Sequence, residues 1–323
     1  MLSLYQYSYP KTLITQHPLP QRDQSRMMVV DRGRRAWDHR AIRDLPAILR
    51  PGDLLVFNDT RVFPARLLGK DQKIEILLLG KNGAGWKALG KPFKKIAEGM
   101  HIDFGLGLKG TVVGKNGDGL EIRFNNEALL EKAGLPPLPP YIRRNPEPAD
   151  RERYQSIFAK NTGSAAAPTA SFHFTEELVK KLKASGVETA FVTLHVSRDT
   201  FLPIRTDEVK QHKMHGERFF VPKETQTKIK QAKGEGRRVI AVGTTVVRAL
   251  ESDWSQSETK LFITPGFQFK IVDALLTNFH QPASTLLLMV SAFAGRELIL
   301  NAYQEAIAHQ YRLFSYGDSM LIF

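Results

Sequence analysis

The sequence predicts an α/β fold in which a mixed-sheet α/β domain carries an inserted small antiparallel β-barrel domain. After residue 150, strand-like and helix-like segments alternate, which is typical of a sheet with helices on both sides. Between residues 66 and 150, short alternating or apolar runs are separated by Gly, Asn and Asp, which is typical of a small barrel or meander. We therefore expect a discontinuous α/β domain, residues 1–65 and 151–323, interrupted by a barrel at residues 66–150.

Hydrophobic periodicity and stop signals place the elements of the α/β domain. Residues 41–50 have helical spacing and end at Pro51-Gly52, and residues 53–59 are predicted to form a buried strand. Thr175 is placed to cap a helix that ends at Gly186. The remaining expected elements are strands at 187–196 and 237–243, helices at 223–236, 244–252 and 285–295, and an extended Pro-rich connector, LPPLPPYIRRNPEP, at 135–148.

The charge balance favours a polyanionic partner. The 323 residues include 46 Lys and Arg against 33 Asp and Glu, so the formal net charge is +13. A surplus of this size favours salt-sensitive attraction to phosphates, and so to nucleic acid.

The absence of cysteine excludes disulfides, thiolate metal sites and cysteine nucleophiles. No basic region followed by an apolar region begins the chain. The longest apolar run, 285–295, is shorter than the ~20 residues that cross a bilayer, so it is predicted to be a buried helix. We therefore expect a cytoplasmic protein that does not contact a membrane.

Polar side chains follow two of the expected strands, and α/β folds bind ligands at strand ends. FNDTR (57–61) could supply a base or an arginine partner through Asp59, although Asp and Asn are also common turn residues. GTT (243–245) could hold an anion or a polar ligand, or could be an ordinary turn with a threonine cap.

Two further stretches combine small or polar residues with a histidine. In GSAAAPTASFHFT (163–175), small residues either let the backbone approach a ligand before His173 or serve tight packing. In TNFHQPAST (277–285), helix capping by the serine would leave the preceding Asn and His unexplained. Polar groups that converge before a buried helix favour a pocket at the second stretch.

QHKMHGE (211–217) holds two histidines three residues apart and a glutamate. It could be a metal site, an acid–base or substrate pocket, or a turn that contains two histidines. The familiar zinc spacings are absent, whereas His and Glu are common proton-transfer groups, so the pocket is favoured. No GxGxxG motif follows a strand and no Walker A motif is present, so a Rossmann methyltransferase or a nucleotide hydrolase is not supported.

Long motifs run along the chain in a fixed order. They are GDLLVFNDTRVFPARL (52–67), PPYIRR (139–144), RYQSIFA (153–159), GSAAAPTASFHFT (163–175), HKMHGERF (212–219), AVGTTVVRALES (241–252), PGFQFKIVDALLTNFHQPASTLLLMVSAFAG (265–295) and YRLFSYGDSMLI (311–322). In these motifs the chain resembles the S-adenosylmethionine:tRNA ribosyltransferase-isomerase family of queuosine synthesis. In the barrel segment the chain is similar to that family only in its pattern of short apolar runs separated by Gly, Asn and Asp.

The resemblance implies transfer and isomerisation of the ribosyl part of S-adenosylmethionine onto 7-aminomethyl-7-deazaguanine at the wobble position of tRNA. The products would be epoxyqueuosine-tRNA, adenine and methionine. S-adenosylmethionine would be a substrate and no cofactor would be bound permanently, no metal is implied, and tRNA would be the macromolecular partner. The family fold is an α/β domain with an inserted β-barrel, and we expect a monomer.

Three positions depart from glycines that are usual in the family, namely Ser171, Ser197 and Asp199. Glycine at such positions permits positive φ or close approach of a ligand, so the loop after His195 is expected to differ in shape. A tRNA-binding relative without catalysis is therefore an alternative function, and a histidine-dependent metallohydrolase is a weaker one.

The implied chemistry needs a base, an acid and groups that hold the sulfonium and methionine ends of the substrate. The predicted catalytic residues are His173, His195, His215, Glu217 and Asp59. The predicted substrate-binding residues are Asn58, Arg61, Thr244, Thr245, Asn278, His280, Ser284 and Thr285. Arginine suits phosphate and carboxylate groups, and the predicted tRNA-binding residues are Arg143, Arg144 and Arg248. The assignment of base and acid among the catalytic residues is left open.

Overall fold

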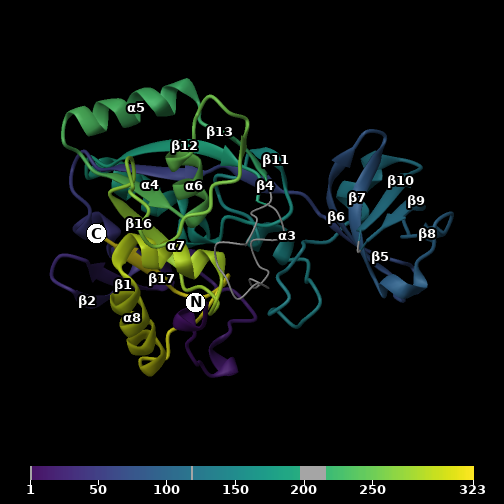
Figure 1. Cartoon of the computed structure of the whole chain (residues 1–323), viewed down its shortest axis with the longest axis horizontal. Coiled ribbons are helices and arrows are strands. Elements are labelled where there is room, and N and C mark those ends of the chain that lie inside the picture. The colour runs from purple at the N-terminus through teal and green to yellow at the C-terminus, as the bar shows by residue number, and fades with distance from the viewer. Residues whose placement is uncertain (1, 118, 197–215) are drawn as a thin grey trace.

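The computed structural model describes residues 2–117, 119–196 and 216–323. Figure 1 shows a large α/β body that holds both chain ends and a smaller all-β body at its side. The smaller body is formed by strands of the middle of the chain, β5 to β10, as the sequence predicts.

A mixed sheet of nine described strands forms the centre of the α/β body. Its spatial order is β15 (Glu258–Thr259), β13 (Glu217–Phe220), β12 (Glu188–Leu194), β3 (Leu54–Asn58), β14 (Val239–Val242), β16 (Ala274–Asn278), β17 (Ser319–Ile322), β1 (Arg26–Asp31) and β2 (Ala36–Ala41). Strands β12, β3, β14 and β16 run parallel to one another, so their carboxyl ends meet at one edge. A separate parallel pair joins β4 (Thr60–Val62) to β11 (Asn161–Ser164).

The central strand β3 is buried on both faces, and its side chains alternate between two hydrophobic cores. Leu54 and Val56 pack in the core on one face, whereas Leu55 and Phe57 pack in the core on the other. This continuous apolar pattern is the one expected of a strand within a parallel sheet covered by helices.

Helices cover both faces of the sheet. The described helices of four or more residues in this body are α1 (Leu45–Ile48), α3 (Asp150–Arg153), α4 (Glu176–Ala184), α5 (Lys223–Gly234), α6 (Thr244–Glu251), α7 (Thr285–Ala294), α8 (Arg296–Ala308), and the 3-10 helices η1 (Leu2–Tyr5) and η7 (Thr169–His173). Side chains of α5 to α8 pack in the first core, and those of α1, α4 and η7 pack in the second. The helix predicted at 41–50 is instead a short 3-10 helix, η4 (Ile42–Asp44), followed by α1, because Pro46 lies in its first α-helical turn.

The smaller body is a six-stranded antiparallel half-barrel with its own apolar core, which includes Leu67, Ile76 and Ile122. Its order is β5 (Arg66–Leu68), β6 (Glu75–Asn82), β7 (Gly85–Lys91), β10 (Gly119–Phe124), β9 (Lys109–Asn116) and β8 (His101–Asp103), with α2 (Leu130–Ala133) after the last strand. The two outer strands, β5 and β8, are not paired as a ladder, so the sheet curls without closing into a full barrel.

The chain enters and leaves the half-barrel at one place. Arg66 and Leu135 form an antiparallel bridge, with the Arg66 amide 3.1 Å from the Leu135 carbonyl and the reverse pair at 2.7 Å. The connector that follows packs back on the α/β body, where Ile142 joins a small core with Val62 and Phe172. The predicted boundary at residue 150 stays a prediction, and these contacts favour a boundary nearer Leu135.

The described helices include none that is individually long and apolar enough to cross a membrane. Helices α7 and α8 reach the required length and composition only when taken together, and a bend of 113° separates them. The prediction of a buried helix at 285–295 is confirmed by α7, whose inward side chains belong to the first core.

Candidate active site

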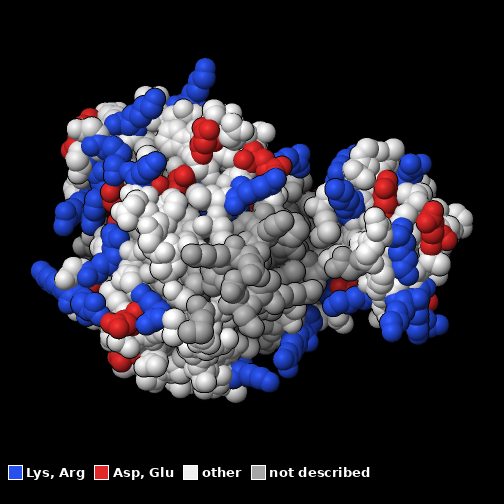
Figure 2. All heavy atoms as spheres, in the orientation of Figure 1, with Lys and Arg blue, Asp and Glu red and all other residues white. Residues whose placement is uncertain are grey.

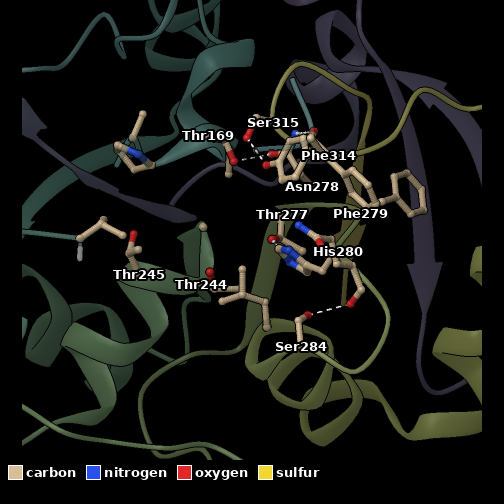
Figure 3. Close-up of a pocket in the computed structure, with 18 of the residues that line it drawn as sticks. Thr169, Thr244, Thr245, Thr277, Asn278, Phe279, His280, Ser284, Phe314 and Ser315 are labelled. Atoms are coloured by element: carbon tan, nitrogen blue, oxygen red, sulfur yellow. Dashed lines mark hydrogen bonds between the residues drawn. The ribbon is translucent and has the colours of Figure 1, made fainter. Parts of the chain in front are cut away.

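A pocket of about 720 Å³ lies at the carboxyl edge of the parallel strands. It is lined by residues that directly follow β12, β14 and β16, by η7, by the connector and by the segment before β17 (Figure 3). The lining residues are Tyr141, Ala167, Pro168, Thr169, Ala170, Val196, Gly243, Thr244, Thr245, Thr277, Asn278, Phe279, His280, Gln281, Pro282, Ser284, Leu286, Phe314 and Ser315.

Helix α6 points its amino terminus at this pocket. Its N-cap is Gly243, whose φ of 103° favours glycine and whose lack of a side chain leaves the first turn uncapped. Thr244 and Thr245 form that first turn, and both line the pocket. Asn58, at the end of β3, donates to the Thr245 hydroxyl (3.2 Å) and to the Leu194 carbonyl (2.9 Å), and thereby fixes the threonine from behind.

The stretch after β16 supplies the opposite wall. The Asn278 amide nitrogen donates to the Phe314 carbonyl (3.0 Å), and its oxygen lies 3.5 Å from the Thr169 hydroxyl. Figure 3 shows these groups across the space from Thr244 and Thr245. The local fold is therefore fixed by hydrogen bonds between segments that are far apart in sequence.

His280 in the same stretch is buried and neutral. Its Nε2 lies 2.9 Å from the Thr277 hydroxyl, and burial lowers its pKa to about 3. Ser284 caps α7 by accepting a bond from the Leu287 amide (3.2 Å), as predicted. Its hydroxyl also donates to the Gln281 carbonyl (2.7 Å), so both of its bonding directions are already used within the protein.

A second polar cluster lies at the ends of β3 and β12, next to the pocket. Asp59 accepts from the Thr193 hydroxyl (2.6 Å) and from the Asn161 amide (2.9 Å). His195 is half-buried, and its Nδ1 lies 2.8 Å from the Thr60 hydroxyl. Burial, followed by the charge of Arg218, lowers the pKa of His195, and the carboxylate of Asp59 opposes that shift.

Gly163 explains part of the small-residue stretch before η7. A Cβ atom at this position would come within 2.8 Å of the His195 ring. The glycine therefore lets the β11 backbone lie directly against the imidazole. The stretch thus serves close packing against a side chain rather than, at this position, close approach of a ligand.

His173 does not line the pocket. It is buried at the end of η7 in a hollow that also includes Arg22, Arg153 and Ser315, of which Ser315 is shared with the pocket. Burial lowers the pKa of His173 to about 4, and its Nε2 is buried without a hydrogen-bond partner. It is therefore neutral near pH 7.

Glu217 and Arg248 form an ion pair inside the α/β body, with 3% and 4% of their surfaces exposed. Glu217 lies on β13 and Arg248 on α6. Arg248, which was predicted to contact tRNA, offers no exposed guanidinium to a phosphate, because its side chain lies beneath the surface.

The other predicted arginines lie near the half-barrel. Arg61 pairs with Glu131 at 3.4 Å, away from the pocket. Arg144 makes a two-pronged contact with buried Asp150, at 2.6 and 2.7 Å. Arg143 is exposed, and its guanidinium makes no ion pair or hydrogen bond with a described residue.

Comparison with known proteins decides the family. The family "Queuosine biosynthesis protein" matches residues 2–322. The chain belongs to this family. It is 49% identical to the S-adenosylmethionine:tRNA ribosyltransferase-isomerase of Anaeromyxobacter dehalogenans and 49% identical to that of Symbiobacterium thermophilum, over 99% of this chain and 99% of each relative. The crystal structure of S-adenosylmethionine tRNA ribosyltransferase from Thermotoga maritima is similar, with a TM-score of 0.57, 38% identity, and coverage of 99% of this chain and 100% of that one.

Within this member of the queuosine biosynthesis family, the pocket brings together five of the predicted substrate-binding residues. These are Thr244, Thr245, Asn278, His280 and Ser284. Asn58 lies behind the wall and Thr285 lines an adjoining cavity. His215, and the substituted positions Ser197 and Asp199, lie outside the described residues. Their predicted roles, like those of the other candidates, stay predictions.

Ser171 replaces a family glycine without backbone strain. It lies inside η7, which has a right-handed backbone, so positive φ is not required here. Its hydroxyl is buried and has no hydrogen-bond partner. Serine at this position is therefore compatible with the same η7 backbone that glycine would allow.

Sequence reasoning missed the aromatic wall of the pocket. Tyr141 and Phe314 line it with their rings 5.0 Å apart, and the Tyr141 hydroxyl lies 2.6 Å from that of Ser315. Tyr141 belongs to the PPYIRR motif, in which the arginines alone were given a role, and Phe314 belongs to the YRLFSYGDSMLI motif, in which no residue was given one. The signal was their presence in long motifs outside any expected helix or strand.

One described cluster has the composition of a metal site, namely His39, Glu305 and His309. Its ligand atoms lie within 4.8 Å of one another, on β2 and at the end of α8. None of these residues lines the pocket.

Proposed function

We propose that this pocket is the S-adenosylmethionine site of a tRNA ribosyltransferase-isomerase in queuosine biosynthesis. One observation carries the proposal: five residues predicted from separate family motifs line a single pocket of about 720 Å³. Relatives that are 49% identical over nearly the full length bear the name of this activity. The reaction transfers and isomerises the ribosyl part of S-adenosylmethionine onto the 7-deazaguanine precursor in tRNA, with release of adenine and methionine.

The lining of the pocket suits a sulfonium substrate. None of the described residues that form it carries a charge near neutral pH, since its one histidine has a pKa of about 3. The rings of Tyr141 and Phe314 offer aromatic faces, which attract cations without a costly buried carboxylate. The threonine and asparagine groups remain to orient the adenine and ribose parts by hydrogen bonds.

His195 is the best-placed proton acceptor among the described histidines. The reaction begins with removal of a C5′ hydrogen, which the positive sulfur makes acidic, so a modest base suffices. His280 and His173 are buried with pKa values of about 3 and 4, so they resist taking up a proton. His195 is only half-buried, and its pKa is lowered to a smaller degree, so it is neutral near pH 7 and still open to a proton. Asp59 would stabilise the imidazolium that forms.

The tRNA would lie along the connector between the two bodies. A groove of about 970 Å³ there is lined by Arg66, Lys91, Arg143 and Arg144. Figure 2 shows Lys and Arg side chains spread over both bodies on the face in view. Tyr141 of the same connector lines the pocket, so phosphates held in the groove would keep the modified base close to the substrate.

The test is single-turnover release of adenine from S-adenosylmethionine in the presence of tRNA that carries the 7-deazaguanine precursor. We expect release that depends on this tRNA and that persists after treatment with a chelator. Binding of tRNA without release of adenine would support the non-catalytic relative instead. Loss of release on chelation, restored by zinc, would support the metallohydrolase alternative.

A further inference from the structure

A smaller cavity of about 330 Å³ continues the pocket beneath the start of α6. The two share Thr244, Thr245 and Leu286, so they adjoin at these residues, and we call them the outer and the inner lobe. The inner lobe is mainly apolar and is completed by Leu261, Phe262, Ile263, Thr285, Met289 and Arg248.

Arg248 presents an unused donor to this inner lobe. Its Nε donates to the Leu261 carbonyl at 3.1 Å, and its Nη1 donates to Glu217. Its Nη2 is buried and has no hydrogen-bond partner. A buried charged donor without an acceptor is costly, and such a group in a cavity wall points to a ligand.

The start of α6 adds a second source of positive potential. Arg248 lies one turn after Thr244 on the same helix face, and helical side chains lean toward the amino terminus. The first turn contains no acidic residue and its N-cap has no side chain, so the helix dipole is not offset there. Arg248 is also the one cationic side chain among the described residues that line either lobe.

We propose that Arg248 and the amino terminus of α6 bind the carboxylate at the methionyl end of S-adenosylmethionine in the inner lobe. This inference rests on the proposed function and adds the orientation of the substrate. The carboxylate is the one anionic group of that molecule, and it is small enough for the lobe. Adenine and ribose are then left in the outer lobe, where Asn278, Thr169 and the aromatic rings lie. Arg248 thus becomes a residue for the small substrate instead of for the tRNA.

The experiment compares binding of S-adenosylmethionine with binding of its decarboxylated analogue by calorimetry, without tRNA. The wild-type protein should bind the decarboxylated compound about 10- to 100-fold more weakly, because a charge-assisted hydrogen bond is lost. In a Glu217→Leu/Arg248→Met variant, S-adenosylmethionine should bind as weakly as the analogue, so the ratio should approach one. Replacing both partners avoids leaving a buried carboxylate unpaired.

A matched control is Asp53→Leu/Arg238→Met, which removes the ion pair between buried Asp53 and half-buried Arg238 at the starts of β3 and β14. This control should lose stability in a thermal melt yet keep the wild-type binding ratio. Equal binding of both compounds by the wild-type protein would overturn the inference while leaving the proposed function intact. An undiminished ratio in the Glu217/Arg248 variant would overturn it as well. Failure of the wild-type protein to bind either compound would count against the proposed function itself.

Discussion

The pocket at the strand ends and the groove beside the half-barrel hold opposite kinds of groups. The described residues that line the outer pocket have no charge near pH 7, and they are fixed by hydrogen bonds between distant segments. The groove is lined by four Lys and Arg side chains, of which Arg143 and Lys91 are exposed. The net charge of +13 therefore says little about the pocket, where a cationic substrate would be repelled by a basic wall.

This difference separates two kinds of selectivity in one molecule. In the proposed function, shape and hydrogen bonds would select a small sulfonium in the pocket, and these interactions are insensitive to salt. Charge would select a polyanion in the groove, and its contribution would fall as salt rises. Substitutions in one region should therefore change one substrate and spare the other.

The largest expected effect comes from His195→Gln, which keeps a polar side chain but removes the base. Single-turnover release of adenine should fall about 10²- to 10⁴-fold, the range for a lost acid–base group. Affinity for tRNA should not change, because phosphate contacts hold it elsewhere. The rate is to be normalised to folded protein by a thermal melt of the same sample. A normal rate per folded molecule would remove His195 from the mechanism and leave His215 as the next candidate.

A smaller effect is expected from Arg143→Ala in the groove. Removal of one phosphate contact should weaken tRNA binding a few-fold and reduce the slope of log affinity against log salt by about 1, measured between about 50 and 200 mM. Affinity for S-adenosylmethionine should stay at the wild-type value. Arg34→Ala is the control, because Arg34 is also exposed but lies between β1 and β2, where it pairs with Asp31 at 3.7 Å. An equal loss in both variants would mean that tRNA responds to net charge alone.

The smallest effect concerns pH and stability. His280 has a pKa of about 3 in the folded protein, against about 6.5 when unfolded, so below pH 6.5 the unfolded chain binds more protons. The free energy of unfolding should therefore fall as pH is lowered, by about 2 kcal/mol between pH 6.5 and 5 for this residue. Urea unfolding at both pH values should show a shallower fall in His280→Asn. Arg143→Ala should retain the wild-type fall, and a wild-type fall in His280→Asn would show that the pocket is not kept neutral by burial.

The parts of the fold that depend on local sequence were predictable. The caps Thr175 and Ser284 form the expected bonds, at 3.1 and 3.2 Å, because a cap depends on residues within one turn. The apolar strand at 53–59 and the onset of short alternating runs at residue 66 were also sufficient to separate the two bodies. Both signals depend on composition over a few residues, which the sequence states directly.

The parts of the site that depend on distant contacts were not predictable from pattern alone. The pairing of Glu217 with Arg248 joins a strand to a helix, and nothing in either motif indicates that the arginine is buried. The place of Tyr141 in the pocket depends on how the connector returns from the half-barrel to reach Phe314. His173 and His195 look alike in sequence, and their different burial separates their pKa values.

The bridge between Arg66 and Leu135 holds the two ends of the half-barrel segment together, as a strand pair holds the loop of a β-hairpin. For the α/β body, the segment between Arg66 and Leu135 is equivalent to a tight turn, since the chain leaves and returns across one pair of hydrogen bonds. The ends are already held together, so lengthening or shortening the loops of the half-barrel adds little to the entropy of closing that turn. The size of the half-barrel can therefore change while the arrangement of residues at the strand ends stays as it is.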